Sequence, residues 1–129
     1  MNEASVDSPD VLGWSLASGF GRIAFGLAMI TAPEPALRAL GFDEVTRATV
    51  AVTRIAGIRD LVLGVVTLGA LDDRRRLRAA TLANAAADAG DTLAFSLALG
   101  DGERDAGLRG LAAALPATVA GAWTAWRLR

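Results

Sequence analysis

The sequence predicts an all-α protein, an antiparallel bundle of four transmembrane helices with both termini on the cytoplasmic side of the cell membrane. Hydrophobic residues make up 53% of the 129-residue chain and the mean hydropathy is +0.39, more apolar than an ordinary soluble domain. The charged residues gather in short stretches between apolar segments, and each segment is close to the roughly 20 residues that cross a bilayer. We therefore expect one membrane-embedded domain over residues 1–129.

The four helices are expected at residues 11–32, 49–71, 77–99 and 107–127. Pro33-Glu34-Pro35 is expected to end the first helix, the charged run 72–76 the second, and the Gly- and Asp-rich stretch 100–105 the third. The N-terminal stretch MNEASVDSPD is polar and acidic, unlike the basic start of a secretory signal peptide. The first helix is therefore expected to be retained.

The orientation follows from the arginines in the connections. Six arginines lie in the N-terminal tail, the 72–78 loop and the C-terminal tail, against four in the 33–48 and 101–109 loops. Because positively charged loops tend to stay in the cytoplasm, the first set is expected there. Trp14, Trp123 and Trp126 would all lie at this same interface, as amphipathic rings at headgroup depth do.

Six charged residues fall inside the expected spans, and their formal charges sum to zero. They are Arg22 in the first span, Arg54, Arg59 and Asp60 in the second, and Asp88 and Asp91 in the third. A charge at mid-bilayer costs about 2.5–3.5 kcal/mol on insertion scales, so these residues must pair or contact water. Four of them lie near the middle of their spans and are expected to meet at one level: Arg22, Arg59, Asp60 and Asp88.

Polar residues recur at spacings of four and three in the third span: Thr81, Asn84, Asp88 and Asp91. This stripe is expected to face the bundle axis. Antiparallel helices place Arg54 and Asp91 on the same side of mid-membrane, which predicts an Arg54–Asp91 pair. Arg59 points away from the midline of its helix at Gly57, so it is expected to reach a neighbouring helix or a partner subunit.

Small residues spaced by four form faces on the last two spans: Ala86, Gly90, Ala94 and Ala98 on the third, and Ala113, Ala117, Gly121 and Ala125 on the fourth. Such faces allow close helix packing in lipid and favour a homo-oligomer. The fourth span has no ionisable residue between Arg109 and Arg127, so it is expected to serve packing. Its lack of a polar face also disfavours a soluble bundle.

The composition excludes several kinds of chemistry. The chain contains no Cys and no His, which rules out thiol nucleophiles, thiolate or imidazole metal ligands and a Ser-His relay. The net charge is −1 and no basic stripe with interleaved aromatics occurs, so no nucleic-acid partner is expected. No metal or cofactor is predicted. Carboxylates, arginines and hydroxyls remain as the groups for chemistry.

The second and third spans contain a motif that resembles a known family. The motif reads Arg54-x-x-x-x-Arg59-Asp60-Leu61-x-x-Gly64, followed by the mid-span Asp88. It looks like the pattern of a family of small bacterial four-helix membrane proteins known as a domain of unknown function. The resemblance implies the four-span architecture and matches Arg59, Asp60, Gly64 and Asp88 to the family's polar signature. It implies no reaction, ligand or cofactor.

The sequence leaves three functions open. The first is binding or transport of a small anionic or amphipathic ligand, contacted by Arg22, Arg54, Arg59 and Asn84. The second is a membrane enzyme of the isomerase or cyclase type, in which Asp88, Asp60 or Asp91 moves a proton on a lipid-soluble substrate. The third is a structural or assembly role in which the charges only set helix register. Asp88 is the expected centre of a functional site, because it lies at mid-span on the polar stripe.

Overall fold

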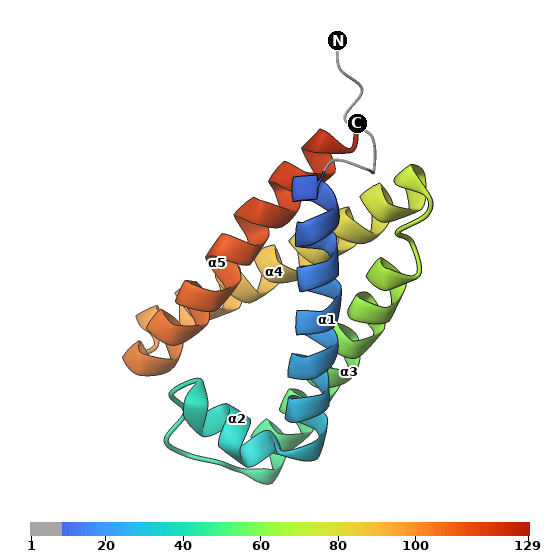
Figure 1. Ribbon diagram of the computed structural model, residues 1–129. Helices are drawn as coiled ribbons and strands as arrows, with labels where there is room; N and C mark the ends of the chain where they lie inside the picture. The colour runs from blue at the N-terminus through green and yellow to red at the C-terminus, as the bar shows by residue number, and fades with distance from the viewer. Residues whose placement is uncertain (1–8) are drawn as a thin grey trace.

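Residues 9–129 are described by the computed structural model, and they form five helices and no strand (Figure 1). The helices are α1 (Pro9–Thr31), α2 (Pro33–Ala39), α3 (Arg47–Leu68), α4 (Arg74–Gly100) and α5 (Arg104–Arg127). The predicted all-α class is confirmed for this part of the chain. The predictions for the acidic N-terminal stretch fall largely on residues 1–8, which lie outside the described residues.

The four long helices begin and end within three residues of the predicted boundaries, and two details differ. Pro33 does not only follow α1 but also begins α2, because proline has no N–H to satisfy and its fixed φ suits a first helical turn. α4 begins at Arg74 rather than at residue 77. The reason is that Oδ1 of Asp73 accepts hydrogen bonds from the backbone N–H groups of Arg75 and Arg76, at 2.9 and 3.0 Å, and so caps the helix.

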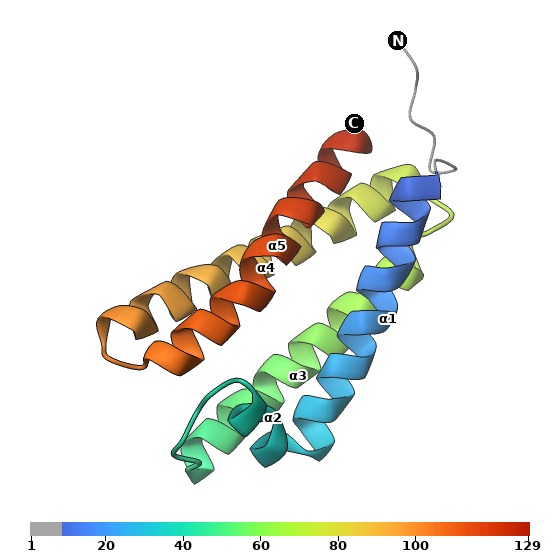
Figure 2. The ribbon, with the colours of Figure 1, turned by 60° about the vertical axis from the view of Figure 1, so that its left-hand side comes forward.

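The long helices pack as two antiparallel pairs, α1 with α3 and α4 with α5 (Figure 2). Glycines allow the backbones of α1 and α3 to touch. A Cβ on Gly26 would lie 2.5 Å from the carbonyl oxygen of Gly57, and a Cβ on Gly64 would lie 2.6 Å from that of Gly19. The two glycines of each helix are seven residues apart, so the contact repeats after two turns. The pairs contact each other far less than their own members do.

An apolar cluster joins the two helix pairs at the end where α1 begins and α5 ends. Its buried members come from all four long helices or the turns beside them: Val11, Ala70, Leu77, Ala80 and Leu128. At the same end, Nη2 of Arg127 lies 3.1 Å from Oδ2 of Asp10. Apolar packing and an ion pair therefore hold the two helix pairs together at this end of the molecule.

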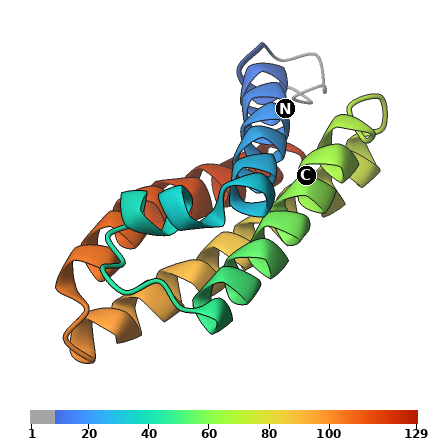
Figure 3. The same ribbon diagram turned by 90° about the horizontal axis from the view of Figure 1, so that it is seen from below.

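The segment from α2 to Gly41 joins the helix pairs at the opposite end: α2 packs against α3 and α1, and the end of the segment contacts the start of α5 (Figure 3). Nη1 of Arg109 donates a hydrogen bond of 3.2 Å to the carbonyl oxygen of Ala39. Gly41 adopts a φ of +91°, which favours glycine, and its Cβ position lies 3.0 Å from the backbone nitrogen of Ala106. The turn after α2 therefore contacts the start of α5 directly. We refer to residues 33–41 as the α2 bridge.

Several polar residues are buried and many large apolar residues are exposed, which is unusual for a water-soluble protein. Asp60 and Asn84 are each 4% exposed, whereas Ile55 is 66% exposed. Exposed apolar side chains of this kind lie on each long helix, for example Phe20, Ile55, Leu97 and Val119. Of the helices in residues 9–129, α1 alone is apolar and long enough by composition to cross a membrane. The charges within α3 and α4 lower the apolar content of those helices, and two of these charged residues, Asp60 and Asp88, are buried.

Candidate ligand site between the helix pairs

A cavity of about 470 Å³ lies between the two helix pairs. Its lining comes from all four long helices and from Leu40 of the α2 bridge. The volume is in the range of pockets that hold small molecules. Five lining residues are exposed: Ala17, Gly21 and Phe25 on α1, Ala94 on α4 and Ala113 on α5. Because four of the five lie on α1 and α5, the cavity opens sideways, mainly between these two helices.

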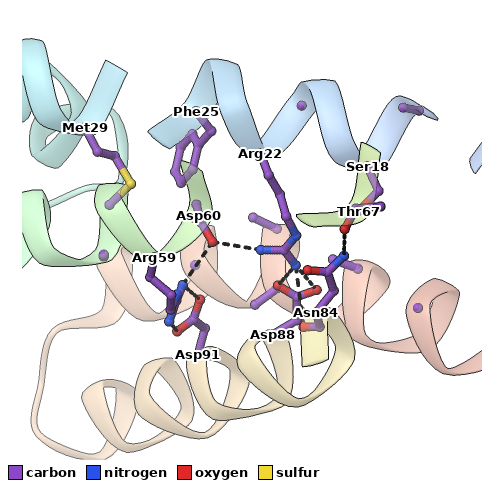
Figure 4. A pocket seen from close by; sticks show the side chains of 18 of the residues that line it. Ser18, Arg22, Phe25, Met29, Arg59, Asp60, Thr67, Asn84, Asp88 and Asp91 are labelled. Carbon is purple, nitrogen blue, oxygen red and sulfur yellow. Dashed lines mark hydrogen bonds and ion pairs between the residues drawn. The ribbon is translucent and has the colours of Figure 1, made fainter. Parts of the chain in front are cut away.

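Arg22 of α1 lies at the centre of the charged wall of this cavity (Figure 4). Its Nη1 donates to Oδ1 of Asp60 at 2.8 Å, and its Nη2 donates to the carboxylate of Asp88 at 2.6 Å. The side chain of Arg22 is only 12% exposed, so both ion pairs are largely shielded from the surroundings. A single side chain thus links α1, α3 and α4 at one level, as the sequence predicted.

Arg59 of α3 forms the second part of the charged wall. Its Nη1 and Nη2 donate to the two carboxylate oxygens of Asp91 at 2.8 and 2.7 Å, a bidentate geometry that is strong and directional. Nη2 also lies 3.4 Å from Oδ1 of Asp60, so Asp60 connects the two arginines. The prediction that Arg59 reaches a neighbouring helix is confirmed.

The predicted Arg54–Asp91 pair is wrong. Nε of Arg54 donates instead to the carbonyl oxygen of Ile30 at 3.4 Å. Ile30 belongs to the last turn of α1, where carbonyl groups lack partners within the helix and attract positive charge. Arg54 is therefore outside the cluster, although the sequence suggested it as a ligand contact.

Without Arg54, the cluster consists of Arg22, Arg59, Asp60, Asp88 and Asp91. Two arginines face three aspartates, so the formal charge of the cluster is −1 rather than the zero expected from the sequence. Every terminal guanidinium nitrogen of the two arginines donates to a carboxylate. Both arginines are therefore paired with carboxylates, and the excess formal charge is negative.

Asn84 extends the charged wall toward the closed end of the molecule. Its Nδ2 donates to Oγ1 of Thr67 at 2.9 Å, and the hydroxyl of Thr67 itself donates to the carbonyl oxygen of Leu63 at 2.8 Å. Because the hydroxyl proton of Thr67 is engaged, Thr67 can only accept from Asn84, which fixes the orientation of the amide. Oδ1 of Asn84 is buried and has no hydrogen-bond partner among the described residues.

The structure thus brings together six of the seven residues that the sequence singled out, namely Arg22, Arg59, Asp60, Asn84, Asp88 and Asp91. Asn84, Asp88 and the neighbouring Thr81 are buried, so the predicted polar stripe of α4 does face inward. Thr67 was missed. Its position seven residues after Asp60 places both on nearly the same face of α3, a spacing that could have revealed it.

The remaining walls of the cavity are apolar. Trp14, Phe25 and Met29 line it from α1, Phe95 from α4, and alanines and glycines from α5. These residues carry no charge pattern, so the sequence alone did not indicate them. In residues 9–129 no group of three or more His, Cys, Asp or Glu side chains is placed to hold a metal ion. The carboxylates of the cluster face guanidinium groups instead.

Comparison with known protein families gives a match over most of the chain. A family model described as "Domain of unknown function (DUF4267)" matches residues 19–127, which include the whole cluster. No curated protein matches the chain. No solved structure matches it either.

Proposed function

The chain belongs to this DUF4267 family, and we propose from its site that it is a membrane-embedded protein that binds a small amphipathic molecule in the cavity between its helix pairs. The observation that carries the proposal is the contrast between the walls of the cavity. One wall is charged and the others are apolar. A molecule with a polar head and an apolar body matches this contrast.

Four membrane spans, α1, α3, α4 and α5, are part of this proposal. These helices contain 22 to 27 residues. At ~1.5 Å per residue this is about 33–40 Å, enough for the ~30 Å hydrocarbon layer. The exposed apolar side chains on every long helix support contact with lipid. Of the ten charged residues in α3 and α4, four pair inside the cluster: Arg59, Asp60, Asp88 and Asp91.

The sideways opening favours a ligand that arrives from the lipid. Most of the exposed lining residues lie on α1 and α5, between the two closed ends of the molecule. In a bilayer this opening would face the hydrocarbon rather than either aqueous side. We therefore propose binding in place of transport through the bundle. A network that only fixed helix register would need no cavity beside it, which sets this proposal apart from a purely structural role.

Membrane insertion can be tested by washing membranes of expressing cells with alkaline carbonate. We expect the protein to stay in the pellet, as integral proteins do. Release of the full-length chain into the supernatant would contradict the membrane part of the proposal.

Ligand binding can be tested with two matched leucine variants of α1. A Cβ on Gly21, which lines the cavity, and a Cβ on Gly13, which does not, both meet nothing within 4 Å. Gly21→Leu therefore adds a large side chain at the opening of the cavity, and Gly13→Leu makes the same change in helix propensity elsewhere on the helix. After purification in mild detergent and solvent extraction, mass spectrometry should find a small amphipathic molecule with the wild type and with Gly13→Leu. It should be depleted in Gly21→Leu. Equal amounts in the two variants would argue against the cavity as the site.

A further inference from the structure

We infer that the head group taken by this cavity is a cationic hydrogen-bond donor, such as an ammonium group on an apolar chain. This inference deepens the proposed function and rests on it. It differs from the expectation from the sequence, where the arginines suggested an anionic ligand. Three independent features of the charged wall lead to it.

The first feature is the charge. Arg22 and Arg59 face Asp60, Asp88 and Asp91, which leaves one excess negative charge in a cluster that is buried at Asp60 and Asp88 and half-buried at Arg59 and Asp91. The cation that balances the six charges in the sequence, Arg54, is bound to the end of α1 instead. An uncompensated charge in a region of low dielectric is costly, and a monocation would neutralise it.

The second feature is that both arginines are already paired with carboxylates. All four terminal nitrogens of Arg22 and Arg59 donate to carboxylates at 2.6–2.8 Å. Each guanidinium keeps N–H groups without an acceptor among the described residues, including both Nε atoms, but its positive charge is already balanced by a carboxylate. An anion bound to these N–H groups would lie beside three negative carboxylates.

The third feature is the presence of free acceptors. Oδ1 of Asn84 is buried without a hydrogen-bond partner within residues 9–129, in a residue that is 4% exposed and lines the cavity. Both hydrogen bonds that Asp60 accepts end on its Oδ1, which leaves Oδ2 without one in the same part of the chain. Buried acceptors without a partner favour a ligand that donates hydrogen bonds, and an ammonium group has up to three N–H donors.

The inference can be tested with three probes that share one chain length and differ in the head group: octylamine, octanol and octanoate. At pH 8 they are cationic, neutral and anionic. The fluorescence of Trp14, which lines the cavity, reports binding when Trp123 and Trp126 are replaced by Phe. Titration of the Gly21→Leu variant of the same background measures how each probe partitions into the detergent micelle, and this signal is subtracted.

We expect octylamine to bind at least about tenfold more tightly than octanol, and octanoate to bind most weakly. Octanoate binding as tightly as octylamine, or no difference between octylamine and octanol, would overturn the inference and leave the proposed function intact. If none of the three probes changes the Trp14 signal beyond the Gly21→Leu background, the proposed function fails as well.

Two neutralising variants locate the effect. Asp60→Asn brings the formal charge of the cluster from −1 to zero, so the preference for octylamine over octanol should fall to within about threefold. Arg54→Gln removes a charge outside the cluster and should keep the full preference. A preference that survives Asp60→Asn would contradict a role for the cluster charge. The wild-type comparison decides the inference by itself if Asp60→Asn does not fold.

Discussion

Replacing Arg22 and replacing Asp88 leave very different charges behind. Arg22 is the ion-pair partner of Asp88 and one of two partners of Asp60. Arg22→Gln therefore leaves three aspartates with one arginine, and we expect a loss of about 3–5 kcal/mol in the free energy of unfolding, as when a buried pair is broken. Asp88→Asn leaves each arginine with a carboxylate, and its side chain can still accept from Arg22. We expect a loss of only about 1–2 kcal/mol.

Unfolding of both variants in mixed micelles of mild detergent and dodecyl sulfate measures this difference. Equal losses would mean that the excess negative charge of the cluster is compensated elsewhere. Since Asp88→Asn removes that excess charge while the fold persists, this variant should also lose the co-purified ligand. A stable Asp88→Asn variant that retains the ligand would contradict a role for Asp88 in the site.

The partner of Asp91 can be identified by double-mutant cycles. Arg59→Gln and Asp91→Asn remove the two sides of the bidentate pair, so their losses in unfolding free energy should be non-additive by about 1 kcal/mol or more. Arg54→Gln combined with Asp91→Asn should be additive within about 0.5 kcal/mol, because Arg54 bonds to Ile30. Coupling between Arg54 and Asp91 instead would support the pairing that the sequence suggested.

The error over Arg54 has a geometric origin. The sequence pattern takes Gly57 as the midline of the inward face of α3, but Gly57 faces α1, against the backbone of Gly26. At about 100° per residue, Asp60 lies on one side of Gly57 and Arg54 on the other. The side with Asp60 turns toward α4, and Arg59 lies further around on that side. The identity and depth of the charged residues are therefore predictable from sequence, but their pairing depends on which helix each face meets.

The close packing of α1 on α3 predicts unequal effects of alanine at different glycines. A Cβ on Gly26 would lie 2.5 Å from a backbone oxygen of Gly57, which cannot move aside as a side chain can. Gly26→Ala should therefore force the helices apart and lower the free energy of unfolding by about 1–3 kcal/mol. Gly90→Ala on α4 meets nothing within 4 Å and should leave stability unchanged or raise it by up to about 1 kcal/mol. Thermal melting in one detergent compares the two variants. A neutral Gly26→Ala would show that the backbones do not touch.

Asp73 gives the start of α4 a cap that depends on pH. The hydrogen bond from the backbone N–H of Arg76, together with that from Arg75, holds the pKa of Asp73 below its ordinary value. A carboxyl whose pKa is lowered by folding stabilises the folded state above its unfolded pKa, and this contribution disappears as the pH falls through the folded pKa. Asp73→Ala should therefore melt below the wild type at pH 7, and the gap should narrow below about pH 4.

Melting curves of the wild type and Asp73→Ala from pH 7 to pH 3 measure this effect. Asp72→Ala serves as the control, because the Asp72 side chain accepts no hydrogen bond within residues 9–129 and should show no such narrowing. A constant gap across this pH range would mean that the charge of Asp73 contributes nothing to the cap.

Helix boundaries were predictable because charged runs, prolines and glycines mark them in the sequence. The short helix α2 was not predictable in this way, because Pro33 indicates the end of a helix as readily as the start of one.

The packing faces of the helices were also only partly predictable. Of the proposed small-residue face on α4, Ala86, Gly90 and Ala94 are exposed rather than packed within the chain. The closest contact uses glycines seven residues apart on α1 and α3, whereas the faces predicted from the sequence consist of small residues spaced by four. Assembly of copies through the α4 face stays a prediction.

The two ends of the molecule should lie on opposite sides of the membrane. The chain has no cysteine, so single cysteines can report each side without background labelling. Asp72→Cys lies in the turn between α3 and α4, and Asp101→Cys in the turn between α4 and α5. By the excess of arginines near the first turn, we expect an impermeant thiol reagent added to intact cells to label Asp101→Cys and spare Asp72→Cys. The reverse pattern would invert the orientation, and labelling of both would exclude a four-span topology.

At the level of the whole chain, the sequence indicates four long helices and buried charges but not the cavity. Hydropathy reports how apolar a helix is and says nothing about which helix it packs against. The pairing of α1 with α3 and of α4 with α5 depends on the shapes of the helix surfaces, above all on the positions of glycines and alanines. Amino-acid composition does not show which of these small residues lie at a helix contact. The space between two such pairs is what remains after both have packed, and no sequence pattern encodes it directly.

The α2 bridge gives this space a fixed width. α2 is separated from α1 by Ala32 alone, and its far end is bound to α5 through Ala39 and Gly41. A helix of seven residues is about 10 Å long and rigid, so it keeps its two ends at a fixed distance. The width of the opening between α1 and α5 therefore depends on the length of α2. The polar groups that contact the ligand belong to the charged cluster. Lengthening or shortening α2 would change which molecules fit into the cavity without altering any residue that contacts the polar head group of the ligand.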